Sequence, residues 1–247
     1  MSYFLGIDTS NYTTSVSLYD DTTNIIISKK KLLPVKEGEK GIRQSDAVFH
    51  HTVQLPELIK ELFADKDYKI DGVGVSTKPC NEDGSYMPCF LAGVSVAVSL
   101  SSALNVPLYE FSHQDGHIAA ALYSADAIDF INKKFIAFHI SGGTSQALLV
   151  EPYGDYFKTL KVADSLDLKA GQAVDRVGIS LGLKFPCGPE LEKLAMIVVK
   201  DSAEPEKKAQ DGTLTFLDER FLETPSVAVM EWKAVAAKMA NLSKDSI

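Results

Sequence analysis

Two histidines four residues apart, His113 and His117, are the side chains of this sequence best suited to chemistry. Residues with this spacing lie on one face of an α-helix, about one turn apart, so both imidazoles can aim at one metal ion. Ser112 is suited to be the N-cap of that helix, and Asp115 three residues later fits a capping box. The pair is therefore expected in the first turns of a helix, at the mouth of a loop. The alternative is two polar residues on a solvated helix face.

The composition is that of a globular protein. With 247 residues, of which 45% are hydrophobic, the chain can bury a substantial core as one large domain or two modest ones. It contains no apolar run long enough to span a bilayer and no leader pattern at its start, so we expect a cytoplasmic protein without a membrane partner. The formal net charge of -8 argues against broad nucleic-acid binding by this chain alone, because such binding is mostly phosphate neutralisation.

The cysteines Cys80, Cys89 and Cys187 are expected to be reduced thiols. Their number is odd, and no Cys-x-x-Cys spacing occurs. Both facts argue against a disulfide framework and against a structural zinc site.

The pattern of apolar and turn-forming residues predicts a series of strands and helices that is repeated in part later in the chain. The first series has strands at 3–7, 13–19, 24–28, 73–76 and 106–109, a helix from residue 45 that Pro56 is expected to kink or divide, a helix at 88–104, and a mobile loop at 37–41. After the histidine helix, strands are expected at 135–140, 146–150 and 156–160, followed by a helix at 170–181.

Two successive mixed series indicate an α/β fold with two similar lobes facing a cleft, which is the duplicated ribonuclease-H-like fold of actin and sugar kinases. We expect a first lobe at 1–111, a second lobe at 112–200 that carries the metal and nucleotide motifs, and a divergent tail at 201–247. The tail contains a possible strand at 213–216 and an apolar-periodic helix at 227–242. The second lobe is therefore expected to be truncated or rebuilt.

Each expected lobe begins with a hairpin of small polar residues, the first from Asp8 to Thr14 and the second from Ser141 to Ser145. Glycine lets backbone N–H groups approach an anion closely, and hydroxyl groups add donors, so such hairpins suit the phosphates of a nucleotide. Either hairpin alone is more simply explained as an ordinary turn. We take Asp8, at the tip of the first hairpin, as the candidate catalytic acid.

A series of spaced motifs resembles the TsaD family, the threonylcarbamoyl-adenosine tRNA modification enzymes long labelled O-sialoglycoprotein endopeptidases. The matching positions follow the order of that family along the chain. They are Gly6-Ile7-Asp8-Thr9-Ser10, His50 with Leu55-Pro56, Gly93, Pro107-Leu108, Ser112-His113 with Gly116-His117, Ser141-Gly142-Gly143, Ala170-Gly171 with Ala173 and Asp175, and Leu181-Gly182-Leu183 with Pro186 and Gly188-Pro189.

The resemblance implies metal-dependent transfer of a threonylcarbamoyl group from an adenylate to a tRNA adenosine. It implies a divalent metal, iron or zinc, on His113 and His117, and ATP or threonylcarbamoyl-adenylate as the nucleotide ligand. By the same resemblance the nucleotide contacts are Ser141, Gly142, Gly143, Asp175 and Gly188. Thr144, where the family has His or Asn, is taken with them as a candidate contact. The alternatives are that Asp175 is a surface carboxylate paired with Arg176 or Lys169, and that Gly188 before Pro189 is only the N-cap of a helix.

The chain departs from the pattern of the family at several positions. Asn11-Tyr12-Thr13-Thr14 stands where the family has Cys-Asp-Glu-Thr, and Gln172 stands where it has Glu. The Thr-Asp-Asn segment, whose Asp is the family's third metal ligand, is not found.

A catalytic metal site usually has three protein ligands, and we predict that His139 supplies the third. In the strand at 135–140, alternation places Ala137 and His139 on one face and Phe138 and Ile140 on the other. His113, His117 and His139 would then form a three-histidine site. The alternative is that His139 is a buried neutral histidine bonded to a backbone carbonyl.

Two functions from different classes are consistent with these features. The first is a shortened, divergent acyltransferase that retains the metal and nucleotide site. The second is a non-catalytic scaffold, comparable to the TsaB partner subunit, that forms a homodimer or binds a TsaB-like partner through its N-terminal lobe and contacts tRNA only with partners. The peptidase label has little support, since no His-Glu-x-x-His motif occurs.

Overall fold

The structure of the protein is a computed structural model, and it describes residues 2–10, 12–34, 42–65, 67–154 and 156–201. Within these residues the chain forms two compact units. The first unit comprises the residues up to Phe135 together with Val150–Thr159, and the second comprises Ile136–Leu149 and the residues from Leu160. The expected boundary after residue 111 falls inside the first unit. The predictions for 37–41, 213–216 and 227–242 lie outside the described residues.

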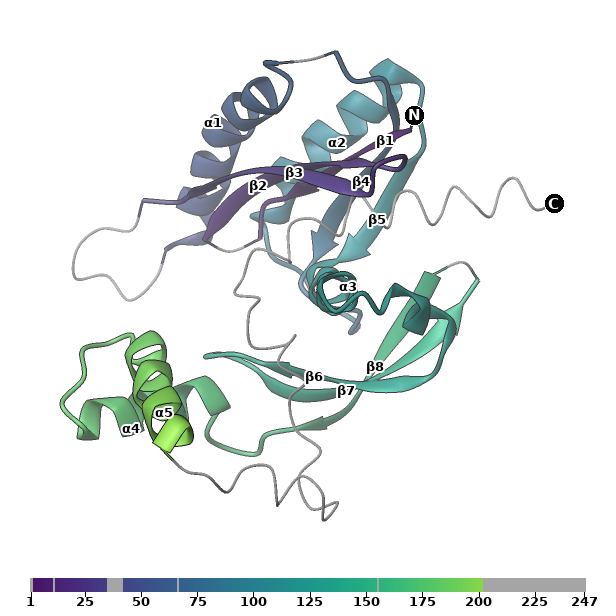
Figure 1. Cartoon of the computed structure of the whole chain (residues 1–247). Coiled ribbons are helices and arrows are strands. Elements are labelled where there is room, and N and C mark those ends of the chain that lie inside the picture. The colour runs from purple at the N-terminus through teal and green to yellow at the C-terminus, as the bar shows by residue number, and fades with distance from the viewer. Residues whose placement is uncertain (1, 11, 35–41, 66, 155, 202–247) are drawn as a thin grey trace. The chain divides into compact units, whose positions relative to one another are not determined.

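Five strands form the sheet of the first unit (Figure 1). They are β1 (Tyr3–Asp8), β2 (Thr13–Asp20), β3 (Ile25–Leu32), β4 (Ile70–Lys78) and β5 (Leu108–Ser112). Their order in the sheet is β3-β2-β1-β4-β5; β1, β2 and β3 pair antiparallel, whereas β4 pairs parallel with both β1 and β5. An antiparallel meander extended by parallel crossover strands is the ribonuclease-H-like sheet, so the predicted fold class is confirmed.

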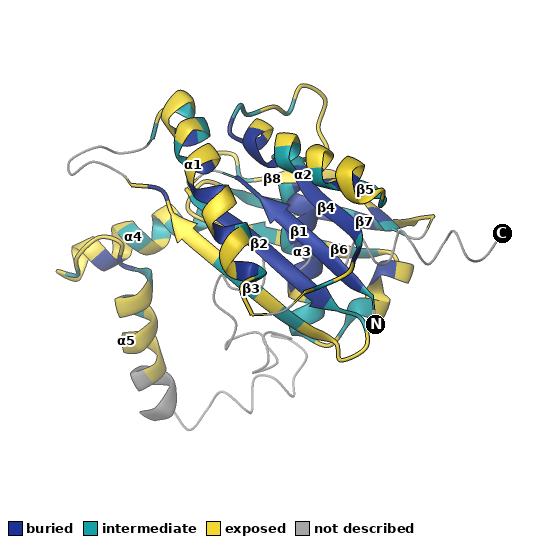
Figure 2. Cartoon of the chain, turned by 90° about the horizontal axis from the view of Figure 1, so that it is seen from above, coloured by how far each residue is buried: buried dark blue, intermediate teal, exposed yellow. Residues whose placement is uncertain are grey.

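Helices cover both faces of this sheet. The helices α1 (Gln44–Leu62) and α2 (Phe90–Leu104) pack against each other on one face, and α3 (His113–Ser124) lies on the other (Figures 1 and 2). Pro56 lies within α1 and does not divide it. No helix in the described part of the chain is both long and apolar enough to cross a membrane.

The core of the first unit lies between the sheet and the pair α1 and α2. Leu5 and Ile7 alternate toward this face of β1, and Leu55, Leu58 and Leu62 form one stripe of α1 at spacings of three and four residues. All five side chains are at most 4% exposed, and Figure 2 shows β1 and β4 buried at the centre of the sheet. This core fixes the strands whose ends carry the candidate site.

The second sheet has the strand order β6-β7-β8. Its strands are β6 (Phe135–Ile140), β7 (Ser145–Tyr153) and β8 (Tyr156–Asp164), and the helices α4 (Ala170–Ser180) and α5 (Gly188–Asp201) follow; a short 3-10 helix, η1 (Ile128–Asn132), precedes them. The predicted repeat of three strands and a helix is therefore present. No fourth or fifth strand of this sheet occurs up to residue 201, where the described chain ends.

The contact between α2 and the end of β1 leaves no room for a side chain at Gly93. A Cβ there would lie 2.8 Å from Thr9 Oγ1, and Thr9 cannot turn away easily because its hydroxyl donates to Cys89 O (2.9 Å) and accepts from Gly93 N (3.1 Å). We expect Gly93→Ala to lower the free energy of unfolding, since overpacking costs about 1–3 kcal/mol whereas the helix propensity of alanine returns at most about 1 kcal/mol. Urea denaturation measures the change.

The matched control for Gly93→Ala is Ser95→Ala, at an exposed position of the same helix. It is expected to change the free energy of unfolding by less than about 0.5 kcal/mol. Equal stability of Gly93→Ala and the wild type would show that the Thr9 contact is not tight in solution.

Candidate functional site

The candidate site of the first unit forms where three neighbouring strands end. Because β1, β4 and β5 run parallel, their carboxyl ends meet at one edge of the sheet, which is where ligands bind in open α/β sheets. The register pairs Ile7 with Val75 and Ser76 with Phe111. Asp8, Ser76 and the beginning of α3 are thereby brought together.

Asp8 lies at this edge with its carboxylate buried and hydrogen-bonded. Only 3% of the side chain is exposed. Its Oδ1 accepts a hydrogen bond from the backbone N–H of Ser10 (2.7 Å), and its Oδ2 accepts one from the hydroxyl of Ser76 (3.1 Å) and lies 2.9 Å from Nδ1 of His113. The sequence reading missed Ser76, although a polar residue directly after the buried run 73–75 was the available signal.

The histidine pair has the geometry that its spacing predicts. The Ser112 hydroxyl accepts from the N–H of Asp115 (3.1 Å), and the Asp115 carboxylate accepts from the N–H of Ser112 (3.2 Å), so the capping box is confirmed. The rings of His113 and His117 stand edge to face with their centroids 4.4 Å apart. Burial lowers the pKa of His113 to about 4, so its imidazole is neutral at pH 7 and keeps a lone pair for a metal.

Asp115 also fastens α3 to the rest of the first unit. Its carboxylate, 1% exposed, accepts hydrogen bonds from the amide of Asn81 (2.9 Å to each oxygen) and from the hydroxyl of Thr159 (3.2 Å). Burial, with the charge of Asp115 adding to it, raises the pKa of Tyr156 well above its usual value. The sequence predicted the capping role alone, because no local pattern indicates partners 34 and 44 residues away.

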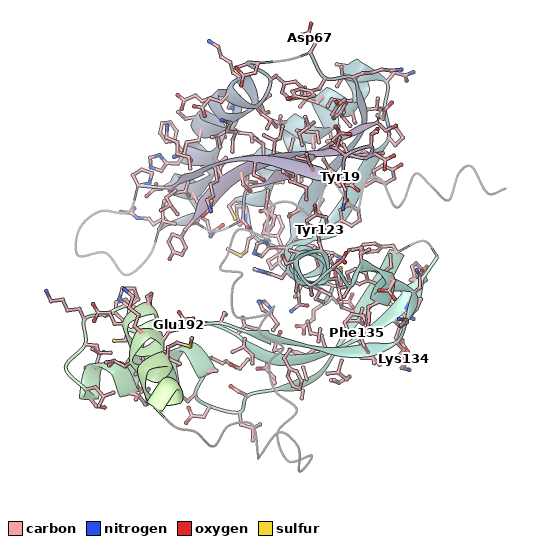
Figure 3. All side chains as sticks on the ribbon, in the orientation of Figure 1. Tyr19, Asp67, Tyr123, Lys134, Phe135 and Glu192 are labelled. Carbon is pink, nitrogen blue, oxygen red and sulfur yellow. The ribbon has the colours of Figure 1, made fainter. Side chains whose placement is uncertain are left out.

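The other end of α3 is tied to the turn between β2 and β3. The hydroxyl of Tyr123 donates to the carbonyl of Asn24 (2.9 Å), and the hydroxyl of Tyr19 donates to its side-chain oxygen (2.7 Å). Figure 3 labels both tyrosines, which lie close together. The helix that carries the histidine pair is thus held at both ends.

In the second unit, the turn after β6 sits against the first turn of α4. Ser141 Oγ accepts from the N–H groups of Gly143 (3.2 Å) and Thr144 (3.0 Å), which fixes the shape of the turn. The first amides of α4 bond back to it: the N–H of Ala170 donates to Ser145 Oγ (2.8 Å), and that of Gly171 donates to the carbonyl of Ser141 (3.2 Å). The predicted nucleotide-binding residues of this turn are therefore in one compact structure.

The glycines of the second unit differ in what the fold demands of them. A Cβ at Gly171 would lie 2.6 Å from the backbone N and Cα of Gly142, so only glycine fits there. A Cβ at Gly142, Gly143 or Gly188 would meet nothing within 4 Å, and none of these three has a positive φ. The described fold therefore does not by itself require glycine at these three positions.

Asp175 connects the two helices of the second unit. Its Oδ1 accepts a hydrogen bond from the N–H of Cys187 (2.8 Å), directly before α5, which begins at Gly188. Lys169, one of the two residues considered as its partner, bonds through Nζ to Asp164 (2.8 Å). Burial raises the pKa of the Cys187 thiol, and the charge of Asp175 adds to this shift.

His139 lies on the face of β6 that alternation predicted. Ala137 and His139 are partly buried, whereas Phe138 and Ile140 are 68% and 61% exposed. His139 belongs to the second unit and the histidine pair to the first, so the three-histidine site stays a prediction. Among the residues that the structure describes, no group of three or more His, Cys, Asp or Glu side chains could hold a metal ion.

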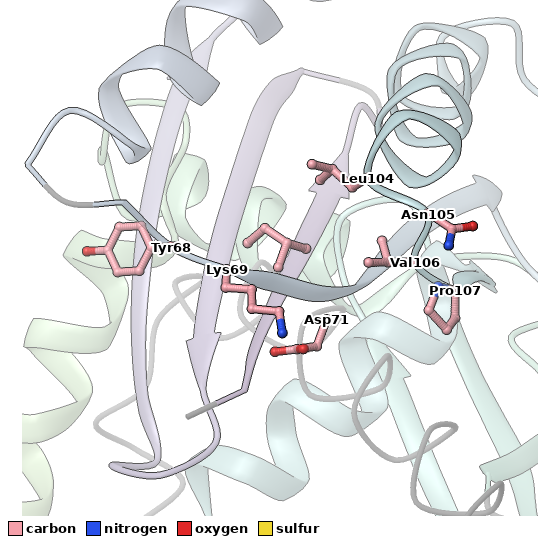
Figure 4. A pocket seen from close by; sticks show the side chains of 8 residues that line it. Tyr68, Lys69, Asp71, Leu104, Asn105, Val106 and Pro107 are labelled. Atoms are coloured by element: carbon pink, nitrogen blue, oxygen red, sulfur yellow. The ribbon is translucent and has the colours of Figure 1, made fainter.

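A cavity of about 480 Å³ lies at the opposite ends of the strands (Figure 4). It is lined by residues 68–71 and 104–107 and contains none of the predicted site residues. The Asp71 carboxylate there accepts a hydrogen bond from the backbone N–H of Tyr3 (3.1 Å). Tyr3 is five residues before Asp8 on β1, which corresponds to roughly 16 Å along the strand. We place the candidate site at the carboxyl edge, where the titratable groups converge.

Comparison with known proteins identifies the family of this chain. The chain matches the model of the TsaD family, described as tRNA N6-adenosine threonylcarbamoyltransferase, over residues 22–241. The protein therefore belongs to the TsaD family. It is 28% identical to the enzyme of that name from Bacillus licheniformis over 216 residues, which are 87% of this chain and 60% of the relative. It is 35% identical to the one from Dictyoglomus turgidum, over 77% of this chain and 55% of the relative.

Solved structures with a similar fold are more distant. YeaZ from Pseudomonas aeruginosa is 15% identical with a TM-score of 0.40, covering 67% of this chain and 66% of that one. The inorganic polyphosphate/ATP-glucomannokinase from Arthrobacter sp. strain KM is 13% identical with a TM-score of 0.44, covering 74% and 73%. The chain spans less than two thirds of the length of the two TsaD relatives above.

The close approach of Gly171 to Gly142 generates a paired prediction. Gly171→Ala should push the turn after β6 away from α4 and break the hydrogen bond to Ser141, lowering the free energy of unfolding by about 1–3 kcal/mol. Gly142→Ala, which adds a methyl group in open space, should leave stability unchanged or raise it slightly. Chemical denaturation checks both; equal stability of the two variants would contradict the contact.

Proposed function

We propose that this chain transfers a threonylcarbamoyl group from threonylcarbamoyl-adenylate to a tRNA adenosine in a metal-dependent reaction. The observation that carries the proposal is the pair His113 and His117, held at the carboxyl edge of the sheet in a TsaD family member. Neutral imidazoles are good ligands for zinc and iron. The donor set therefore fits the implied divalent metal, with His139 proposed as its third protein ligand.

The metal, when bound, would supply Lewis-acid polarisation of the acyl carbonyl. The residues of the chain bind and orient the reactants. The capped helix α3 holds the imidazoles of His113 and His117 in place, and Asp115 prevents the start of that helix from shifting. Such preorganisation matters because small displacements of a catalytic group cost large factors in rate.

The adenylate-binding role is proposed for the turn at 141–144 with Asp175 and Gly188. Gly142, Gly143 and Gly188 are glycines where the described fold leaves space for a side chain, and close approach of a ligand to the backbone gives them a reason to be glycine. The first turn of α5 begins at Gly188, and helix N-termini favour anionic groups. Asp175 uses one carboxylate oxygen for Cys187, and we assign the other to the ribose hydroxyls.

A transfer assay tests the proposed function. The purified chain, zinc or iron(II), synthetic threonylcarbamoyl-adenylate and tRNA are mixed, and threonylcarbamoyl-adenosine is measured by mass spectrometry of the digested RNA. His113→Ala and His117→Ala are expected to lower the rate at least about 100-fold, since Lewis-acid stabilisation amounts to several kcal/mol. Thr52→Ala, at an exposed position of α1, is the control and should retain the rate. Absence of product with the wild-type chain under all these conditions would contradict the transferase function.

A second candidate function, a non-catalytic partner subunit, is favoured by apolar surface on the first unit. Phe49 and Val53 of α1 are 63% and 48% exposed, and Leu91 and Val98 of α2 are 52% and 43% exposed. The spacing of four and seven residues places each pair on one helix face. The small residues of α2, by contrast, include the buried Gly93, which packs on the sheet. The exposed face would bind a second copy of this chain or a TsaB-like subunit.

Light scattering on the purified chain, alone and mixed with a purified TsaB subunit, tests this second function. Phe49→Glu should lower the measured mass of any complex to that of the monomers, because a buried carboxylate without a partner opposes association. Thr22→Glu, an exposed position in the turn after β2, should have no effect. A strict monomer in both samples, the chain alone and the mixture with TsaB, would exclude the scaffold.

A further inference from the structure

The hydrogen bonds of Asp8 leave one arrangement for the ring protons of His113. The N–H of Ser10 and the O–H of Ser76 both donate to the Asp8 carboxylate, and an ionised carboxylate has only acceptor sites. The 2.9 Å contact between Asp8 Oδ2 and His113 Nδ1 therefore requires the proton on Nδ1. A neutral imidazole with its proton on Nδ1 presents its lone pair at Nε2.

We propose that Asp8 is a positioning residue, whose carboxylate fixes the tautomer and ring orientation of His113 so that Nε2 is the atom offered to a divalent metal. This inference rests on the metal site proposed above. A carboxylate bonded to the second nitrogen of a ligating histidine fixes the ring and raises its basicity as a ligand. Asp8 thus acts through His113 and does not touch the substrate.

The surroundings of Asp8 support positioning over direct contact with a ligand. The side chain is 3% exposed, and both of its oxygens accept hydrogen bonds from the protein. Its Oδ2, the oxygen on the side of the histidine pair, already accepts from Ser76 and lies against Nδ1 of His113. The contact with His113 is the route by which Asp8 can influence a metal.

The backbone at Ser10 makes the variant Asp8→Asn unusually informative. The N–H of Ser10, 2.7 Å from Oδ1, cannot turn away, so the amide oxygen of asparagine must take the Oδ1 position. Its NH₂ group then takes the Oδ2 position and faces His113 Nδ1 as a donor. That arrangement favours the opposite tautomer, with the proton on Nε2 and no lone pair available to the metal.

The first measurement uses metal-free protein. Nitrogen-15 NMR of the histidine side chains distinguishes the two tautomers of His113 and does not depend on metal binding or activity. The expected result is a proton on Nδ1 in the wild type and on Nε2 in Asp8→Asn. A proton on Nε2 in the wild type overturns the proposal, and this result is decisive even if Asp8→Asn does not fold.

The second measurement is a titration with Zn²⁺ followed by calorimetry. Asp8→Asn is expected to bind zinc 10- to 100-fold more weakly than the wild type, the range found when the hydrogen-bond partner of a ligand is lost. The matched control is Asp71→Asn, a carboxylate that also accepts from a backbone N–H, at the far end of the strands; its zinc affinity should be unchanged. Equal zinc affinity of Asp8→Asn and the wild type overturns the proposal.

The two measurements separate failure of this inference from failure of the proposed function. A wild-type chain that binds no zinc or iron but has the Nδ1 proton contradicts the metal site and with it the role of Asp8 toward a metal. If the metal-free wild type carries the proton on Nε2 and binds zinc with the same affinity as Asp8→Asn, only the role of Asp8 is contradicted. The proposed metal site then stands. In each variant a thermal melt establishes that the first unit is folded before the titration is interpreted.

Discussion

The hydrogen bond between Asp8 and His113 joins the end of the first strand to the start of the histidine helix, and the candidate site of the first unit depends on it. It exists because β1, β4 and β5 are parallel neighbours, so that their carboxyl ends meet. The apolar core under these strands keeps them in register, and the capping box sets where α3 begins. Moving any one of these elements by one residue would separate the carboxylate from the imidazole.

The second unit is organised by a different constraint, which is contact between backbones. The turn at 141–144 and the first turn of α4 approach each other so closely that Gly171 has no room for a side chain. The first amides of α4 are thereby satisfied by the turn itself. Gly142, Gly143 and Gly188 have no such constraint, because a side chain at these positions would meet nothing within 4 Å.

The sequence predicted the local features of the site and could not predict its long-range contacts. The capped helix with its histidine pair and the alternation around His139 follow from spacing and residue type, and both are present. The burial of Asp8 and its bond to Ser76 depend on which strands become neighbours, which no local pattern records. Asp115 shows the same limit, since its capping role is visible in four residues whereas its bonds to Asn81 and Thr159 require the tertiary fold.

The separation of these partners along the chain also bears on how the protein folds. Asp8 and Ser76 are 68 residues apart, and Asp8 and His113 are 105 residues apart. Contacts of such high sequence separation carry a large loop-closure entropy and form slowly compared with local ones. The imidazole of His113 can meet Asp8 only when both parallel crossovers are in place. The contact between Asp8 and His113 is therefore expected to form late in folding, once the first sheet is complete.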